Sequence, residues 1–271
     1  MPELPEVETT RRGLTPHILG QTISKVVVRQ ANLRWPISTE ISTLLPGAKL
    51  NAISRRGKYL LFDTTAGFFI VHLGMSGSLR LVQPDEPAAR HDHIDWVFGH
   101  GLSLRLRDPR RFGAVLWGGS TPLQHSLLVN LGMEPLSADF TAERFFLATR
   151  NRSAAIKQIL MDSHVVVGVG NIYANEALFA AGIRPATPAQ RLSRPRIAKL
   201  VAAVDATLAR AINAGGSTLR DFLQADGSAG YFQLSHAVYG RAGKLCFSCK
   251  APIKLTRMGQ RATYYCAQCQ K

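Results

Sequence analysis

Cys246-Phe247-Ser248-Cys249 and Cys266-Ala267-Gln268-Cys269, which hold all four cysteines of the chain, decide the fold of the C-terminal segment. A Cys-x-x-Cys turn directs two thiolates toward one metal ion, and two such turns complete a closed tetrahedral zinc shell. Two disulfide bonds are the alternative, but they are typical of secreted proteins, and the N-terminus does not resemble a signal peptide. We therefore expect one structural Zn²⁺ per chain, no organic cofactor, and a reducing, cytoplasmic location.

The segment around these cysteines is strongly basic. From Gly227 to Lys271 there are seven Lys and Arg residues and no Asp or Glu. A zinc tetrathiolate is itself negative and would attract two or three of these cations, which leaves the others for a phosphate backbone. The strand-like runs Ala251–Thr256 and Ala262–Tyr265 predict a β-hairpin with basic residues at its tip.

The whole chain carries a surplus of positive charge. Its 271 residues contain 33 Lys and Arg and 18 Asp and Glu, which gives a net charge of +15. This balance favours a polyanionic partner, with nucleic acid first and an anionic membrane surface second. A membrane-spanning protein is not expected, because no apolar run approaches the ~18 residues that a spanning helix needs.

Upstream of the cysteines, the chain divides into a β-rich region and a helical region. After one N-terminal helix, residues 1–133 contain short alternating segments separated by turns, which is typical of a sandwich or barrel. We expect a linker over 134–150, a helical domain over 151–235 and the zinc finger over 236–271. The expected strands are Thr22–Arg29, Lys49–Ser54, Tyr59–Thr64, Gly67–His72, Ser78–Gln83, Asp92–Phe98, Leu102–Arg107 and Ala114–Trp117.

Three helices are predicted in the helical region: Ser153–Asp162, Ile172–Ala181 and a third that Ser193 caps. Between the first two lies His164-Val165-Val166-Val167-Gly168-Val169-Gly170-Asn171. Such a turn exposes backbone N–H groups that can bind a phosphate at a helix start. A glycine-rich turn between helices is often only a turn, but Lys157 and the segment Arg150-Asn151-Arg152 favour nucleic acid.

The N-terminus suggests covalent chemistry. Pro2 follows the initiator Met, and its removal would leave a secondary amine. Pro5, Glu6 and Glu8 mark the first turn of a helix, whose positive end disfavours an ammonium and lowers its pKa. A neutral secondary amine can attack a sugar carbon and form an iminium, with Glu3 as acid or base. A plain Pro- and Glu-rich helix start is the alternative.

Taken together, the motifs resemble those of the bacterial formamidopyrimidine-DNA glycosylase family, from one end of the chain to the other. The related endonuclease VIII enzymes typically have Gly where this chain has Leu4, so the resemblance favours the former group. The motifs are Met1-Pro2-Glu3-Leu4-Pro5-Glu6-Val7-Glu8-Thr9, His72-Leu73-Gly74-Met75-Ser76-Gly77, Asp108-Pro109-Arg110-Arg111-Phe112-Gly113, Val167-Gly168-Val169-Gly170-Asn171-Ile172-Tyr173-Ala174 and the four-cysteine finger.

The resemblance implies a role for individual residues. Pro2 would be the nucleophile that attacks C1′ of the damaged nucleotide, and Glu3 the proton donor. Lys58 would act near the sugar and phosphate in β-elimination, and Arg261 in δ-elimination and phosphate binding. Met75, Arg110 and Phe112 would form a wedge that fills the space left by the extruded base. Further DNA contacts are implied for His72, His91, Arg152, Lys157, Asn171 and Tyr239.

The implied fold is an α+β protein of several domains. It has an N-terminal helix with a β-sandwich, then a helix-two-turn-helix domain and the zinc finger. The implied activity is a monomeric DNA glycosylase and AP lyase that excises oxidised purines from damaged duplex DNA through a proline Schiff base. Residues 217–231 resemble the loop that covers the lesion. The alternatives are a glycosylase for oxidised pyrimidines and a catalytically silent DNA-binding protein.

Two strands carry patterns that allow more than one interpretation. His91, His93 and Asp95 share one face of a strand, where a metal site is conceivable, although the resemblance implies none. The run Arg105-Leu106-Arg107 is interpreted either as a solvated strand face or as a DNA contact.

Overall fold

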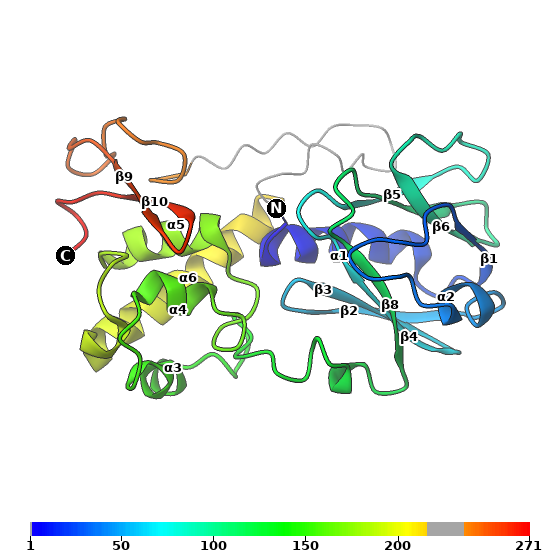
Figure 1. Ribbon diagram of the computed structural model, residues 1–271, viewed down its shortest axis with the longest axis horizontal. Coiled ribbons are helices and arrows are strands. Elements are labelled where there is room, and N and C mark those ends of the chain that lie inside the picture. The colour runs from blue at the N-terminus through cyan, green and yellow to red at the C-terminus, as the bar shows by residue number, and fades with distance from the viewer. Residues whose placement is uncertain (1, 216–235) are drawn as a thin grey trace. The chain divides into compact units, whose positions relative to one another are not determined.

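The structure, a computed structural model, describes residues 2–215 and 236–271. The chain forms two compact units, the first within Met1–Val129 and the second within Asn130–Ala214 and the C-terminal segment from residue 236 (Figure 1). The segment 217–231, expected to cover the lesion, lies outside the described residues. Within the described ranges, no helix combines the length and apolarity that a bilayer crossing requires.

The first unit is one helix packed with two four-stranded antiparallel sheets, as the sequence predicts. The strand order is β1-β6-β7-β5 in one sheet and β2-β3-β4-β8 in the other. The elements are α1 (Leu4–Ile18), β1 (Ile23–Val28), α2 (Glu40–Thr43), β2 (Leu50–Arg56), β3 (Tyr59–Thr64), β4 (Gly67–His72), β5 (Ser78–Val82), β6 (Asp92–Phe98), β7 (Ser103–Arg107), β8 (Ala114–Gly119) and the 3₁₀ turn η1 (Pro122–Gln124).

Large apolar side chains hold the two sheets together. Phe62 of β3 stacks on Phe69 of β4, with 4.5 Å between ring centroids, and Phe69 lies 5.3 Å from Trp96 of the other sheet. Helix α1 contributes Val7 and Leu14 to the same core. Apolar residues spaced three or four apart along α1 face this core, which explains why the acidic N-terminus is ordered against the sandwich.

The second unit combines helices with the C-terminal hairpin. A Gly-rich turn separates α4 from α5, and α6 is an amphipathic helix that packs on α5 and α3. The elements are α3 (Ala142–Thr149), α4 (Ile156–Met161), α5 (Asn171–Ala181), the 3₁₀ turn η2 (Ala189–Arg191), α6 (Arg194–Asn213), β9 (Lys254–Met258) and β10 (Arg261–Tyr265). The segment 134–150, expected to be a linker, contains α3.

The interpretation of residues 105–107 as a solvated strand face is wrong. Arg105 is fully buried, and its Nε and Nη2 each donate to Asp95 of the neighbouring strand at 2.9 Å. Its Nη2 also donates to the Glu86 carbonyl at 2.9 Å. The loop before β6 therefore covers this face of the sheet, and a charge can be buried there because it is paired.

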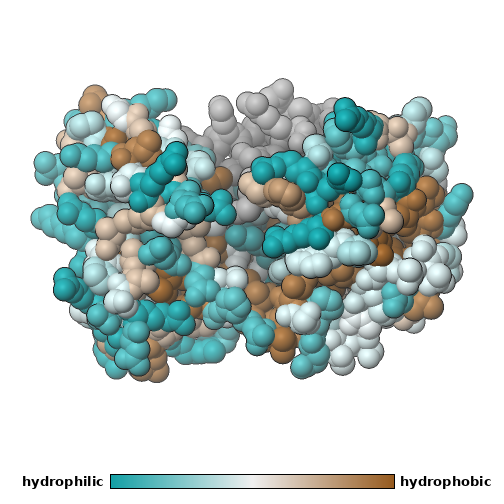
Figure 2. All heavy atoms as spheres, in the orientation of Figure 1, coloured by the Kyte–Doolittle hydropathy of each residue, from teal (hydrophilic) through white to brown (hydrophobic). Residues whose placement is uncertain are grey.

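On the face that Figure 2 shows, hydrophilic residues predominate and apolar residues form small groups.

Candidate functional site

The first predicted site residues lie at the beginning of α1. Glu3 is the N-cap, is buried, and forms a capping box with Glu6, whose carboxylate accepts the Glu3 N–H at 2.9 Å. Pro2, half-buried, directly precedes this cap. Its nitrogen is therefore held at the positive end of a helix of 15 residues, next to a buried carboxyl group. This is the arrangement that the amine chemistry requires.

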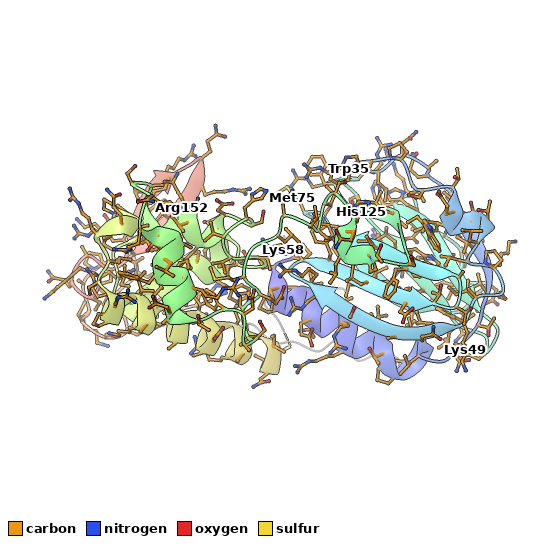
Figure 3. The ribbon with its side chains drawn as sticks, turned by 90° about the horizontal axis from the view of Figure 1, so that it is seen from below. Trp35, Lys49, Lys58, Met75, His125 and Arg152 are labelled. Carbon is orange, nitrogen blue, oxygen red and sulfur yellow. The ribbon has the colours of Figure 1, made fainter. Side chains whose placement is uncertain are left out.

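Lys58 lies on the tight turn between β2 and β3, where Gly57 adopts a positive φ of 57°. Figure 3 shows Lys58 and Met75 toward the same end of the first unit, with Lys49 at the opposite end of the sheet. Tyr59, the next residue, is the antiparallel partner of His72, and their rings lie 4.7 Å apart. The sheet register therefore brings the Lys58 turn beside His72.

His72 is held as a neutral hydrogen-bond donor. Its Nδ1 accepts the Gly74 N–H at 3.1 Å, so the neutral ring carries its proton on Nε2. Burial, which has the largest effect, and the positive charges of Lys58 and Arg34 together lower its pKa from 6.5 to about 4, against a smaller opposing effect of Asp108. An N–H donor beside a lysine is suited to binding a phosphate oxygen.

The three predicted wedge residues come from two turns that pack backbone against backbone. Gly74, with φ of 60°, lies so close to the second turn that a Cβ there would stand 2.4 Å from the Phe112 carbonyl carbon. Met75 follows Gly74 and is half-buried, whereas Phe112 is 43 % exposed. The Arg110 guanidinium lies 4.8 Å from the centroid of the Phe112 ring. The fold therefore presents two apolar side chains and one cation together.

Asp108 organises the second of these turns, a role that the sequence analysis did not assign. Its buried carboxylate accepts the Ser76 hydroxyl at 2.7 Å and the Gly113 N–H at 2.7 Å. One hydrogen bond thus reaches the Met75 turn, and the other closes the turn of Arg110 and Phe112. The Asp-Pro pair at the start of the motif was a sequence cue for such a turn.

In the second unit, two predicted DNA contacts converge on the hairpin. The Lys157 ammonium donates to the Ala262 carbonyl at 2.9 Å and to the Thr263 hydroxyl at 2.7 Å, and the Asn171 amide donates to the same carbonyl at 3.0 Å. Ala262 follows Arg261, which is exposed at the start of β10. Lys157 is buried and supports the hairpin, so its direct contact with DNA stays a prediction.

Tyr239 is positioned by a carboxylate that the sequence analysis did not single out. Glu176 of α5 accepts the backbone N–H groups of Ala237, Val238 and Tyr239 at 2.7, 2.9 and 2.8 Å. The Tyr239 ring packs 5.2 Å from Tyr264 of β10. The segment that enters the finger is thus fixed to α5 and to the hairpin.

The four cysteines form one cluster. The Sγ atoms of Cys246, Cys249, Cys266 and Cys269 all lie within 4.8 Å of one another. The Cys249–Cys266 separation is 3.4 Å and the Cys246–Cys269 separation is 3.8 Å. Thiolates at tetrahedral positions around a zinc ion lie about 3.8 Å apart, given a Zn–S distance of ~2.3 Å. The donor set and its spacing fit a structural metal ion.

His91 and Arg152 are the remaining predicted residues, and the His91 carbonyl accepts the Asp108 N–H at 3.0 Å. His91 is half-buried at the start of β6, and Arg152 is exposed between α3 and α4, where it pairs with Asp162 at 3.4 Å. In the described parts of the chain, the cysteine cluster is the one group of His, Cys, Asp and Glu ligands with metal-binding geometry. The alternative metal site at His91, His93 and Asp95 does not have this geometry, since Asp95 pairs with Arg29 and Arg105.

Comparison with known proteins agrees with this geometry over the full length of the chain. Residues 1–115 match the formamidopyrimidine-DNA glycosylase N-terminal domain, and residues 131–223 match the formamidopyrimidine-DNA glycosylase H2TH domain. The formamidopyrimidine-DNA glycosylase of Stutzerimonas stutzeri is 54 % identical over 271 residues, which is all of both chains.

Solved structures give the same result. The Lactococcus lactis enzyme in complex with DNA containing an abasic site superposes with a TM-score of 0.91 at 35 % identity over 99 % of each chain. The complex of that enzyme with N7-benzyl-Fapy-dG DNA gives 0.91 at 35 % identity over all of both chains. On the domain matches, the identity and the shared fold, the chain belongs to the formamidopyrimidine-DNA glycosylase family.

Proposed function

We propose that this protein is a bifunctional DNA glycosylase and AP lyase that removes oxidised purines, 8-oxoguanine and formamidopyrimidines, from duplex DNA. The observation that carries the proposal is the placement of Pro2 at the N-terminus of α1, beside the buried Glu3 carboxyl. Two complexes of one relative, the Lactococcus lactis enzyme, with DNA that contains an abasic site and with DNA that contains a formamidopyrimidine derivative, support the substrate class.

The first step uses the amine of Pro2 after Met1 is removed. The helix end disfavours its protonated form, so the lone pair is available to attack C1′ of the damaged nucleotide. The C1′–N bond to the base breaks, Glu3 donates a proton to the departing base, and the proton that the amine nitrogen loses returns Glu3 to its acid form. Glu3 supplies a proton to the opening sugar ring, and the nitrogen and C1′ become an iminium, which is a Schiff base.

The next steps break the DNA strand. The iminium acidifies C2′, so loss of a proton there expels the 3′ phosphate by β-elimination, and δ-elimination then expels the 5′ phosphate. Lys58 and the neutral His72 would act beside the first phosphate, because the sheet register places them together. Arg261 would bind a phosphate from the exposed end of β10.

Extrusion of the damaged base leaves a space in the duplex. We propose that Met75 and Phe112 fill it and that Arg110 pairs with the orphaned base, since the two packed turns present all three. We also propose that His91 of the first unit, and Arg152, Asn171 and Tyr239 of the second unit, contact the DNA backbone.

The cysteine cluster would hold one Zn²⁺, which shapes the hairpin and takes no part in the chemistry because four thiolates close its coordination shell. Removing one ligand tests this. In Cys249→Ser we expect loss of the metal and of DNA binding while the first unit stays folded. Metal analysis and binding to a labelled duplex measure both, and a variant that keeps one zinc and full DNA affinity would contradict the assignment.

Borohydride trapping tests the covalent step. Reduction of the iminium should give a stable adduct of protein and an 8-oxoguanine duplex, whereas Pro2→Gly should lose normal turnover. Glu3→Gln keeps the amine and is expected to lose base excision. Intact-mass analysis of the same preparations shows whether Met1 is removed, because an acylated Pro2 nitrogen is not a nucleophile.

Two outcomes would replace this proposal. Faster cleavage of a duplex with thymine glycol than of one with 8-oxoguanine opposite cytosine would indicate an enzyme for oxidised pyrimidines. A wild-type protein with a free Pro2 that binds DNA and forms no adduct would indicate a catalytically silent DNA-binding protein. We further propose that the chain acts as a monomer on bacterial DNA in the cytoplasm, which size-exclusion chromatography and cell fractionation test.

A further inference from the structure

One carboxylate in the first helix gathers three arginines. Glu8 Oε1 lies 2.8 Å from Arg11 Nη2 and 2.8 Å from Arg12 Nε, and Glu8 Oε2 lies 3.2 Å from Arg55 Nε. Burial opposes ionisation of Glu8, but its hydrogen bonds to Arg11 and Arg12 and the charges of Arg11 and Arg55 bring its pKa to about 2. The cluster is therefore charged and intact at neutral pH.

Arg55 connects this cluster to the turn that carries Lys58. It lies near the end of β2 with a side chain that is 11 % exposed, and its Nη1 donates to the Gly57 carbonyl at 2.9 Å. Arg11 Nη1 of α1 donates a second hydrogen bond to this strand, to the Ile53 carbonyl at 3.3 Å. The guanidinium of Arg55 thus bonds at once to a helix carboxylate and to the turn backbone.

The proposed nucleophile Pro2 and the proposed acid Glu3 lie at the N-terminus of the same helix, α1. Glu8 follows Glu3 by five residues, which is about 7.5 Å along a helix axis. The planar guanidinium of Arg55 is hydrogen-bonded to Glu8 on one side and to the Gly57 carbonyl on the other. We therefore expect it to fix the Lys58 turn relative to Pro2 and Glu3.

We propose that Glu8 and Arg55 are positioning residues that hold the Lys58 turn at its working distance from the N-terminus of α1. The inference rests on the proposed function and deepens it. Neither side chain touches substrate in this scheme; each acts through Lys58. Because a displacement of about 1 Å in a catalytic group can cost ~100-fold in rate, loss of the bridge should be visible in the lyase step.

Single-turnover strand cleavage of a duplex with a preformed abasic site tests the inference, since base excision is then bypassed. Arg55→Ala should slow cleavage by about 10- to 100-fold. The matched control is Arg12→Ala. Arg12 pairs with Glu8 alone within the described residues and its side chain is 55 % exposed, so cleavage should stay close to the wild-type rate.

A double-mutant cycle separates positioning from general destabilisation. If Arg55 acts through Lys58, then adding Arg55→Ala to Lys58→Ala should change the rate by less than twofold, because the positioned group is already gone. If Arg55→Ala slows Lys58→Ala by as much as it slows the wild type, the proposal is wrong. An unchanged rate in the single variant overturns it as well.

Glu8→Gln provides a second test in case Arg55→Ala does not fold. The glutamine side chain has the shape of the glutamate side chain but lacks its negative charge, so only the ionic interaction with the arginines is weakened. The variant should slow cleavage in the same step and show the same lack of effect in Lys58→Ala. A wild-type protein that gives no borohydride adduct refutes the proposed function, whereas normal trapping with a fully active Arg55→Ala refutes this inference alone.

Discussion

The half-buried imidazole of His72 should make the stability of the first unit sensitive to acid. The ring is neutral in the folded state because its pKa is about 4, whereas in the unfolded chain it is the ordinary 6.5. As the pH falls through 6.5 the unfolded state binds the proton first. Stability is therefore fully present above pH 6.5 and is lost as the pH falls toward 4.

The two pKa values set the magnitude of the effect. Between pH 7 and pH 5, linkage gives a loss of about 2 kcal/mol from this one group, approaching about 3 kcal/mol below pH 4. His72→Asn is the matched variant, because the amide oxygen can accept the Gly74 N–H in place of Nδ1 and does not titrate. In the variant, the free energy of unfolding should not show this decrease between pH 7 and pH 5, because the substitution removes His72 and retains every other titrating group.

Tryptophan fluorescence makes the assay specific to the first unit. The three tryptophans of the chain, Trp35, Trp96 and Trp117, all lie within it. Urea unfolding of wild type and His72→Asn at pH 7 and at pH 5 gives the free energy lost by each. Equal losses in the two proteins, or a His72 pKa near 6.5 measured by NMR in the folded protein, would refute the reasoning.

Three further substitutions follow from the packing. Arg105→Leu leaves the buried Asp95 short of its bidentate partner and should lower the stability of the first unit by about 3 kcal/mol, measured by the same fluorescence transition. Gly74→Ala places a methyl 2.4 Å from the Phe112 backbone at a positive φ, so affinity for damaged duplex should fall more than tenfold in an equilibrium binding assay while the far-ultraviolet spectrum is retained; full affinity would count against the wedge. Lys157→Met removes two hydrogen bonds to the hairpin and should speed metal loss to a chelator, whereas an unchanged loss rate would show that the helices do not support the finger.

The sequence predicted most of the first unit because its strands are short, alternating and bounded by turn residues. Tyr59–Thr64, Gly67–His72 and Asp92–Phe98 coincide with β3, β4 and β6. Helix α3 was not predicted, because its eight residues make only about two turns, too few to establish a helical repeat in the sequence. The hairpin was predicted, but β9 begins at Lys254, later than the apolar run suggested.

Long-range pairing explains what the sequence could not predict. Arg105 looked solvated because its burial depends on Asp95 across the sheet and on the carbonyl of Glu86 in a loop. The same holds for Glu176, whose three backbone partners lie more than sixty residues later in the chain. Motif resemblance predicts which side chains contact DNA, but it does not identify the groups that hold those side chains in place.

Under the proposed function, the carbonyl of Ala262 would make metal and nucleic acid thermodynamically linked ligands. Lys157 and Asn171 both donate to this oxygen, which lies in the hairpin that the cysteine cluster shapes. Any free energy by which metal orders the hairpin, and so would hold Asn171 in place for the proposed phosphate contact, must reappear as a higher metal affinity once DNA is bound. The equilibrium affinity for the metal should accordingly rise on the duplex, by the same factor by which metal tightens DNA binding.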